Sequence, residues 1–186
     1  SIKQDLIDWK DLPNQDSIFN DKTELSFKKL SLKNISFQYP GKNELALENI
    51  SIDIEKNKAY GFVGKSGAGK STLVDIILGL IAPKSGTIDL DDKNFEIYGS
   101  RLWQKSIGYV PQSIFLADAS IEENIAFGIP KKEINLDKLQ HSIFLSNVKD
   151  LIEEMPLGIK TIVGEKGLQL SGGQRQRIAI ARALYH

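Results

Sequence analysis

The stretch GKSGAGKST, residues 64–72, constrains the fold more than any other part of this 186-residue chain. An apolar run, AYGFVG (59–64), precedes it, and STLVDIILGL (71–80) follows it with apolar residues at helical spacing. These flanks predict a buried strand, a glycine-rich turn and a helix, which together begin an α/β fold. Glycines let the backbone N–H groups of such a turn face inward, at the positive end of the helix. The stretch therefore predicts a phosphate-binding loop.

The residue types in this loop match the needs of a bound nucleotide. The sequence fits GxxxxGK[ST], in which the lysine supplies positive charge to the β and γ phosphates. The serine hydroxyl of the motif is a ligand for Mg²⁺. We expect the nucleotide to contact Gly64, Lys65, Ser66, Gly67, Ala68, Gly69, Lys70, Ser71 and Thr72.

Alternating apolar residues around the loop predict further strands. The alternation runs over 30–39, with a change of phase between Leu32 and Ile35, and returns over 50–54 after a Pro-Gly turn. This pattern predicts two antiparallel strands. SGTIDL (85–90) and SIGYVPQ (106–112) predict two more.

The segment from about Ser113 to Leu170 has a helical pattern instead. SIEE (120–123) is a capping box that opens a helix. Apolar residues at i, i+3, i+4 and i+7 over 148–155 predict another helix, which Pro156 and the following glycine stop. We expect a helical subdomain, about 113–183, inserted into the α/β core.

Composition excludes several classes of protein. Lys plus Arg and Asp plus Glu both number 24, so no overall field attracts nucleic acid or an anionic membrane. The absence of cysteine excludes disulfides and thiolate metal sites.

The most apolar run, Val74 to Pro83, is too short to span a bilayer, and the first residues do not form a signal peptide. Residues 1–26 are polar and aperiodic, as in a linker.

A second glycine-rich stretch, LSGGQ (170–174), opens a run of good helix formers. Ser171 suits an N-cap, whereas Gly172 and Gly173 cost about 1 kcal/mol each inside a helix. In return they expose backbone donors where an anion can approach closely. A capped helix with a flexible entry is the alternative. Because the first loop already surrounds one nucleotide's phosphates, the economical interpretation is that LSGGQ serves a nucleotide held by another copy.

GKSGAGKST followed by LSGGQ resembles the nucleotide-binding domain of ABC (ATP-binding cassette) transporters, over about residues 30–186. LSGGQ alone arises by chance in roughly a few chains per ten thousand. The resemblance implies an α/β, P-loop NTPase (RecA-like) core with an antiparallel β subdomain and an inserted helical subdomain. It also implies ATP and Mg²⁺ as cofactors.

The resemblance assigns roles to residues outside the first loop. Tyr39 matches the aromatic that stacks on adenine, although it also continues the strand alternation. Gln112, in YVPQ, matches the glutamine that reaches Mg²⁺ and the attacking water; a polar turn residue is the alternative. Lys70 and Gln112 are then the catalytic candidates, and Ser71 and Gln112 the Mg²⁺ ligands. The second copy's nucleotide is expected to contact Ser171, Gly172, Gly173 and Gln174.

Two further stretches resemble the exporters of this family. VGEKG (163–167) matches the loop that touches the membrane domain, with Glu165 as the contact residue, and ASIEENIAFG (119–128) matches the first helix of the insertion. The expected partners are a second nucleotide-binding domain, as a homodimer, and transmembrane domains, with the chain at the cytoplasmic face of the membrane. Residues 1–26 then join the membrane domain to the ATPase domain, residues 27–186.

Other functions stay open at this point. A soluble ABC ATPase without membrane domains and a non-hydrolysing regulatory nucleotide-binding module are alternatives, whereas a P-loop kinase or GTPase has no use for LSGGQ. Arg175, Arg177 and Arg182 lack interleaved aromatics, which indicates a solvated or packing face and no nucleic-acid contact.

The family's Walker B aspartate and glutamate and its switch histidine are not in this sequence, and His186 is not assigned that last role. We therefore expect the C-terminal part of the domain to be missing. A longer parent would carry these groups, and this chain alone would bind ATP without hydrolysing it appreciably.

Overall fold

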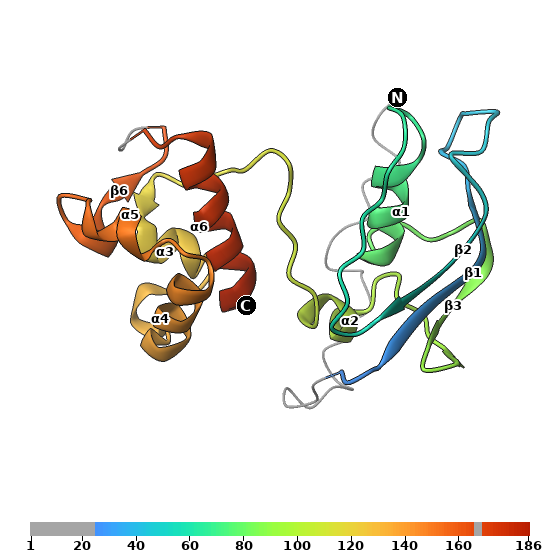
Figure 1. Cartoon of the computed structure of the whole chain (residues 1–186), viewed down its shortest axis with the longest axis horizontal. Coiled ribbons are helices and arrows are strands. Elements are labelled where there is room, and N and C mark those ends of the chain that lie inside the picture. Colours follow the sequence, from blue (N-terminus) through green and yellow to red (C-terminus); the bar gives the residue numbers. More distant parts are fainter. Residues whose placement is uncertain (1–24, 166–168) are drawn as a thin grey trace, which may run out of the picture. The chain divides into compact units, whose positions relative to one another are not determined.

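The computed structural model describes residues 25–165 and 169–186, which form a mixed α/β fold in two compact units (Figure 1). The first unit ends at Ser106 and the second begins at Ile107. Most of the predicted linker, residues 1–26, lies outside the described residues. Within the described part of the chain, no helix has the length and apolar character needed to cross a membrane.

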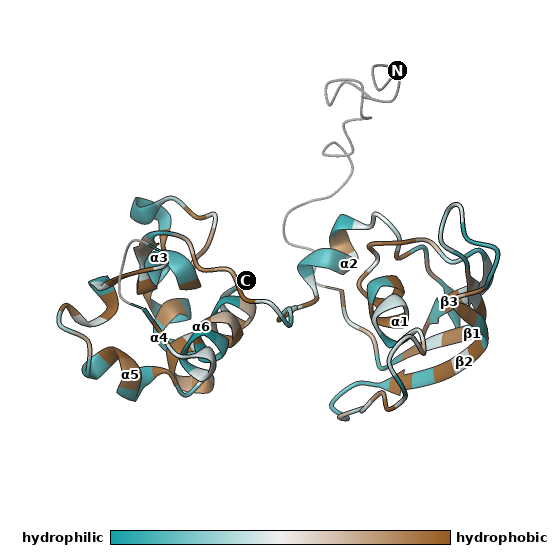
Figure 2. Cartoon of the chain, turned by 90° about the horizontal axis from the view of Figure 1, so that it is seen from above, coloured by the Kyte–Doolittle hydropathy of each residue, from teal (hydrophilic) through white to brown (hydrophobic). Residues whose placement is uncertain are grey.

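An antiparallel sheet in the strand order β2-β1-β3-β4 forms the framework of the first unit. Its strands are β1 (Lys29–Phe37), β2 (Leu47–Glu55), β3 (Ser85–Leu90) and β4 (Lys93–Asn94). The central strand β1 pairs with β2 and β3, so that Leu32 lies opposite Ile52 on one side and Ile88 on the other. The predicted antiparallel pair and the strand predicted over 85–90 are therefore confirmed. Figure 2 shows hydrophobic and hydrophilic residues alternating along β1 and β2.

The change of phase in β1 coincides with an irregular step in its pairing. The register with β2 shifts between Leu32 and Ile35, and Asn34, between them, has a φ of 53°. Between the pairs formed by Leu32 and Ile35, β1 has one residue more than β2. The extra residue reverses the alternation of side chains, and the apolar pattern of the sequence reverses at the same point. The apolar side chains therefore lie on the same face of the sheet before and after the step. Leu32 and Ile35 are both buried as a result.

Helices α1 (Lys70–Ile77) and α2 (Arg101–Lys105) complete the first unit. Leu73 and Ile76 of α1 are buried. Trp103 of α2 is also buried, and its indole N–H donates a hydrogen bond to the carbonyl of Ile77 at 2.7 Å. Because the last carbonyls of a helix lack partners within the helix, this bond satisfies one of them and joins α2 to the end of α1.

Two of the predicted strands are wrong. Residues 59–64 and 106–112 form no strand, and Val63 is 99% exposed. A buried strand needs hydrogen-bonded neighbours for its backbone groups, and no strand of the described residues pairs with either segment. An apolar run of residues therefore did not suffice to predict a strand here.

Where the structure describes it, the second unit is mainly helical and also contains a short antiparallel pair of strands, β5 and β6. Its elements in chain order are β5 (Ala119–Ser120), α3 (Ile121–Ile125), the 3₁₀ helix η3 (Lys131–Glu133), α4 (Leu136–Leu145), α5 (Lys149–Glu153), the 3₁₀ helix η4 (Gly158–Lys160), β6 (Ile162–Val163) and α6 (Gly172–Tyr185). Helix α6 packs against α3 and α4 (Figure 1). The core of this unit includes Ile121, Ile125, Val148, Val163 and Ile178, all fully buried.

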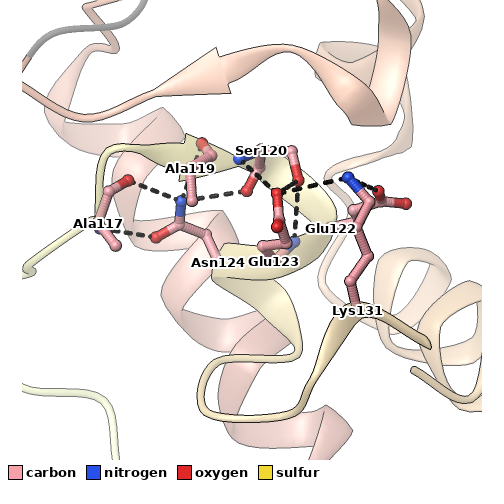
Figure 3. Close-up of polar contacts among 7 residues, drawn as sticks. All are labelled: Ala117, Ala119, Ser120, Glu122, Glu123, Asn124 and Lys131. Atoms are coloured by element: carbon pink, nitrogen blue, oxygen red, sulfur yellow. Dashed lines mark hydrogen bonds and ion pairs between the residues drawn. The ribbon is translucent and has the colours of Figure 1, made fainter. Parts of the chain in front are cut away.

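The predicted capping box is confirmed at the start of α3 (Figure 3). The hydroxyl of Ser120 accepts a hydrogen bond from the backbone N–H of Glu123 at 3.3 Å. The carboxylate of Glu123 accepts hydrogen bonds from the backbone N–H of Ser120, at 3.1 Å, and from its hydroxyl. These bonds, followed by the charge of Lys131, hold the pKa of Glu123 below its ordinary value. The helix predicted over 148–155 is also confirmed, as α5.

Candidate functional site

The predicted phosphate loop curves around the side chain of Lys70. The loop turns through a backbone hydrogen bond from the N–H of Ala68 to the carbonyl of Lys65, at 3.2 Å. Lys70 stands on the first turn of α1, and its Nζ donates hydrogen bonds to the carbonyls of Gly64 at 2.8 Å and Lys65 at 2.7 Å. The loop and its lysine therefore form one local structure, in which the ammonium group is hydrogen-bonded to the backbone of the loop.

The start of α1 is suited to an anion. The helix has no side-chain cap and no acidic residue in its first turn. Its dipole places partial positive charge on the N–H groups there. Ser71 is exposed on this turn, so its hydroxyl is accessible from solvent. The loop, the ammonium group of Lys70 and the helix end together provide what a polyphosphate requires.

Two glycines of the loop have a positive φ, for different structural reasons. Gly67 and Gly69 both have a φ of 81°. A Cβ on Gly67 would meet no atom within 4 Å, whereas a Cβ on Gly69 would lie 2.4 Å from the carbonyl oxygen of Ala46 and 2.7 Å from Cδ2 of Leu47. Gly67 is therefore needed for its conformation alone, and Gly69 also lets the loop approach the start of β2.

Tyr39 lies beside the phosphate loop. Strand β1 ends at Phe37, so Tyr39 falls outside the strand despite continuing its alternation. Its ring packs edge-on against Phe37, with centroids 4.9 Å apart, and its hydroxyl lies 3.0 Å from Oγ1 of Thr72 in α1. Tyr39 is nevertheless 42% exposed, which leaves surface for stacking. Sequence reasoning missed the contact with Thr72, because nothing in either local pattern relates residues 33 positions apart.

LSGGQ forms the N-terminus of α6, and Ser171 is its N-cap as predicted. The hydroxyl of Ser171 accepts a hydrogen bond from the backbone N–H of Gln174 at 3.3 Å. Oε1 of Gln174 accepts one from the N–H of Ser171 at 2.8 Å, which completes a second capping box. The pattern S-x-x-Q is the signal that would have predicted this role of Gln174. Gly172 and Gly173 are exposed, and a Cβ on either would meet no atom within 4 Å.

The predicted site residues are divided between the two units. Tyr39 and the loop residues 64–72 are neighbours in the first unit. Gln112 is exposed in an irregular segment of the second unit, which also contains Ser171. A Mg²⁺ site shared by Ser71 and Gln112 stays a prediction. Residues 25–165 and 169–186 contain no cluster of three or more His, Asp or Glu side chains that could hold a metal ion.

A cleft of about 390 Å³ lies near the start of α6 in the second unit. Phe115 and Glu165 line it, together with Leu170 and Arg175 from the two sides of the LSGGQ turn. Phe115 is 64% exposed, and Arg175 donates a hydrogen bond to the carbonyl of Leu170 at 2.8 Å. Glu165, the predicted contact residue for a membrane domain, therefore borders a cleft that is also lined by apolar residues and by Arg175.

Sequence comparisons identify related proteins over most of the chain. A family model described as ABC transporter matches residues 47–186. The "Uncharacterized ABC transporter ATP-binding protein YfiB" of Bacillus subtilis (strain 168) is 38% identical over 156 residues, covering 84% of this chain and 27% of the relative. An "ATP-dependent lipid A-core flippase" of Shewanella denitrificans is 40% identical over 156 residues, covering 83% of this chain and 26% of the relative.

The fold also matches a solved structure, described as "Structure of a bacterial Atm1-family ABC exporter with ATP bound". The TM-score is 0.76 at 30% sequence identity, and the match covers 90% of this chain and 29% of that one. The chain thus spans about a quarter of the length of these relatives.

Proposed function

Because this chain belongs to the ABC transporter family, we propose that it is the ATP-binding domain of an exporter. In a longer protein it couples ATP binding and hydrolysis to the movement of a substrate across a membrane. The match to an exporter structure with ATP bound supports this proposal, as does the identity with a protein named as an ATP-dependent flippase.

The geometry of the phosphate loop carries the proposal. Two carbonyls of the loop hold the ammonium group of Lys70 at the loop, which supports its proposed role as the positive charge for the β and γ phosphates. The N–H groups at the start of α1 add donors for the same phosphates. The exposed ring of Tyr39, tied to Thr72, offers a stacking surface for the adenine base.

Hydrolysis requires Mg²⁺ and an oriented water in addition to phosphate binding. Ser71 is exposed at the start of α1, and its hydroxyl would hold Mg²⁺ there. The ion would supply positive charge next to the phosphates. Gln112 is the second proposed ligand for Mg²⁺ and the group proposed to orient the attacking water.

The nucleotide held by the phosphate loop of one copy is also contacted by the LSGGQ residues of a second copy. The open space at Gly172 and Gly173 supports this role, because both residues are exposed and a Cβ on either would meet no atom within 4 Å. The capping box keeps Ser171 and Gln174 in place at that surface. ATP binding is thereby coupled to the association of two copies.

The cleft beside Glu165 receives a segment of the transmembrane domain. Its exposed Phe115 supplies apolar surface, and Glu165 and Arg175 supply charges of both signs at its border. Docking there places the chain at the cytoplasmic face of the membrane.

Substitution of Lys70 by alanine tests the proposed function. One charge-assisted hydrogen bond contributes about 1.5–3 kcal/mol, so Lys70→Ala is expected to weaken binding of a fluorescent ATP analogue roughly ten- to hundredfold. In the longer protein the same change abolishes hydrolysis. The matched control is Lys56→Ala, which removes an exposed lysine of the same unit away from the loop. Unchanged ATP affinity in Lys70→Ala would refute the assignment.

A further inference from the structure

The irregular stretch that follows Gln112 is held by side chains from two helices. Asn124, at the end of α3, is fully buried and binds both backbone groups of Ala117 (Figure 3). Its Oδ1 accepts a hydrogen bond from the N–H of Ala117 at 2.9 Å, and its Nδ2 donates one to the carbonyl of Ala117 at 3.0 Å. A side-chain amide thus takes the place of a neighbouring strand for this residue.

Arg182 of α6 completes the network with all three of its guanidinium nitrogens. Nε donates a hydrogen bond to the carbonyl of Asn124 at 2.8 Å, Nη2 to its Oδ1 at 3.2 Å, and Nη1 to the carbonyl of Phe115 at 3.1 Å. The guanidinium also lies 4.9 Å from the centre of the Phe127 ring. The sequence suggested only a solvated or packing face for this arginine; in the structure it fixes the backbone three residues beyond Gln112.

These contacts are not needed to attach α3 to α6. Ile121 and Ile125 of α3 and Ile178 of α6 belong to one buried cluster, and apolar burial of this kind already holds two helices together. The hydrogen bonds of the polar network have a further effect, because they fix the position of the main chain at residues 115–117 relative to α6. Arg182 stands eleven residues after Ser171, or about 16 Å along a straight helix.

We propose that Asn124 and Arg182 are positioning residues that fix the main chain beyond Gln112 to α6, so that Gln112 and the LSGGQ turn are displaced together. The inference rests on the proposed function, in which both groups meet a nucleotide. A rigid helix transmits the position of Arg182 to Gly172 and Gly173 at its other end. Displacement of the stretch after Gln112 then moves the surface that a second copy's nucleotide contacts.

Arg182→Lys is the variant that tests this coupling. Lysine keeps the charge and much of the length, but its ammonium cannot reproduce the planar fork that binds two carbonyls and Oδ1. Arg177→Lys is the matched control on the same helix, because the contact of Arg177 with the carbonyl of Asn147 is long, at 3.4 Å. Arg182→Gln, which retains a planar amide donor, is the second variant should the lysine variant unfold.

Hydrogen exchange of the nucleotide-free chain gives the first readout. In Arg182→Lys we expect the amides of residues 115–119 to exchange about tenfold faster, since tenfold corresponds to the loss of one hydrogen bond to a charged group. In Arg177→Lys they keep the wild-type rate. Equal rates in wild type and Arg182→Lys would overturn the proposal.

ATP hydrolysis by the longer protein gives the second readout. We expect Arg182→Lys to lower kcat by a factor of about ten with KM for ATP unchanged, since the phosphate loop is untouched while the transmission to LSGGQ is weakened. A change confined to KM, or faster exchange with unchanged kcat, would overturn the inference. Failure of the proposed function has a different signal, namely that the wild-type chain does not bind the ATP analogue.

Discussion

Alanine substitution at Gly69 and Gly67 separates a steric requirement from a conformational one. Both positions have a φ of 81°, where an L-residue costs about 1–2 kcal/mol. Gly67→Ala adds nothing further, because its Cβ meets no atom within 4 Å. In Gly69→Ala the Cβ would lie 2.4 Å from the carbonyl oxygen of Ala46, so backbone must move. Overpacking of this kind costs a further ~1–3 kcal/mol, which brings the expected loss for Gly69→Ala to about 2–5 kcal/mol.

Urea unfolding of the nucleotide-free chain measures the difference between the two variants. The fluorescence of the buried Trp103 reports on the first unit, in a Trp9→Phe background that removes the only other tryptophan. With a urea slope of about 2 kcal/mol/M, the midpoint falls by about 0.5–1 M in Gly67→Ala and by about 1–2.5 M in Gly69→Ala. Because no phosphate is present, changes in nucleotide affinity do not contribute. Equal midpoints for the two variants would refute the steric argument.

Three further perturbations test the contacts of the site and of the second unit. Tyr39→Phe and Thr72→Val each remove one hydroxyl of a shared hydrogen bond, so a double-mutant cycle on thermal stability is expected to show a coupling of about 0.5–1.5 kcal/mol. Ser171→Arg leaves ATP binding by one copy intact and abolishes ATP-dependent dimerisation, as measured by light scattering, because a large side chain then covers the LSGGQ surface. The pKa of Glu123 is lower in the folded state than in the unfolded state. The ionised carboxylate therefore stabilises the fold fully above the unfolded-state pKa, and this stabilisation is lost as the pH falls through the folded-state pKa. The melting temperature is therefore expected to fall between about pH 5 and pH 3 by more in wild type than in Glu123→Gln.

Each of these predictions has an outcome that contradicts it. Strictly additive effects of Tyr39→Phe and Thr72→Val would show that the 3.0 Å contact contributes nothing in solution. A dimer of Ser171→Arg that still forms with ATP would argue against the shared nucleotide. Identical pH profiles of wild type and Glu123→Gln would mean that the capping box does not depend on the charge of Glu123.

Features that depend on a few neighbouring residues could be predicted from the sequence. The phosphate loop, the N-caps at Ser120 and Ser171 and the antiparallel pair of strands all follow rules that operate within one turn or one hairpin. The phase change in β1 was visible as a shift in the apolar alternation, and the structure contains an irregular pairing step at that position. The same local rules would have indicated the capping role of Gln174.

Features that depend on partners far along the chain were decided by the tertiary structure alone. The segment 59–64 is apolar enough for a strand, but no described strand pairs with it and Val63 is exposed. Tyr39 forms a hydrogen bond with Thr72, 33 residues away in the sequence, and Arg182 donates one to the carbonyl of Phe115, 67 residues away. Any hydroxyl or backbone carbonyl accepts a hydrogen bond equally well, so the sequence holds no preference for one partner over another. The packing of α3 against α6 brings the carbonyl of Phe115 within hydrogen-bonding distance of Arg182. The partner of the arginine is therefore determined by the tertiary structure.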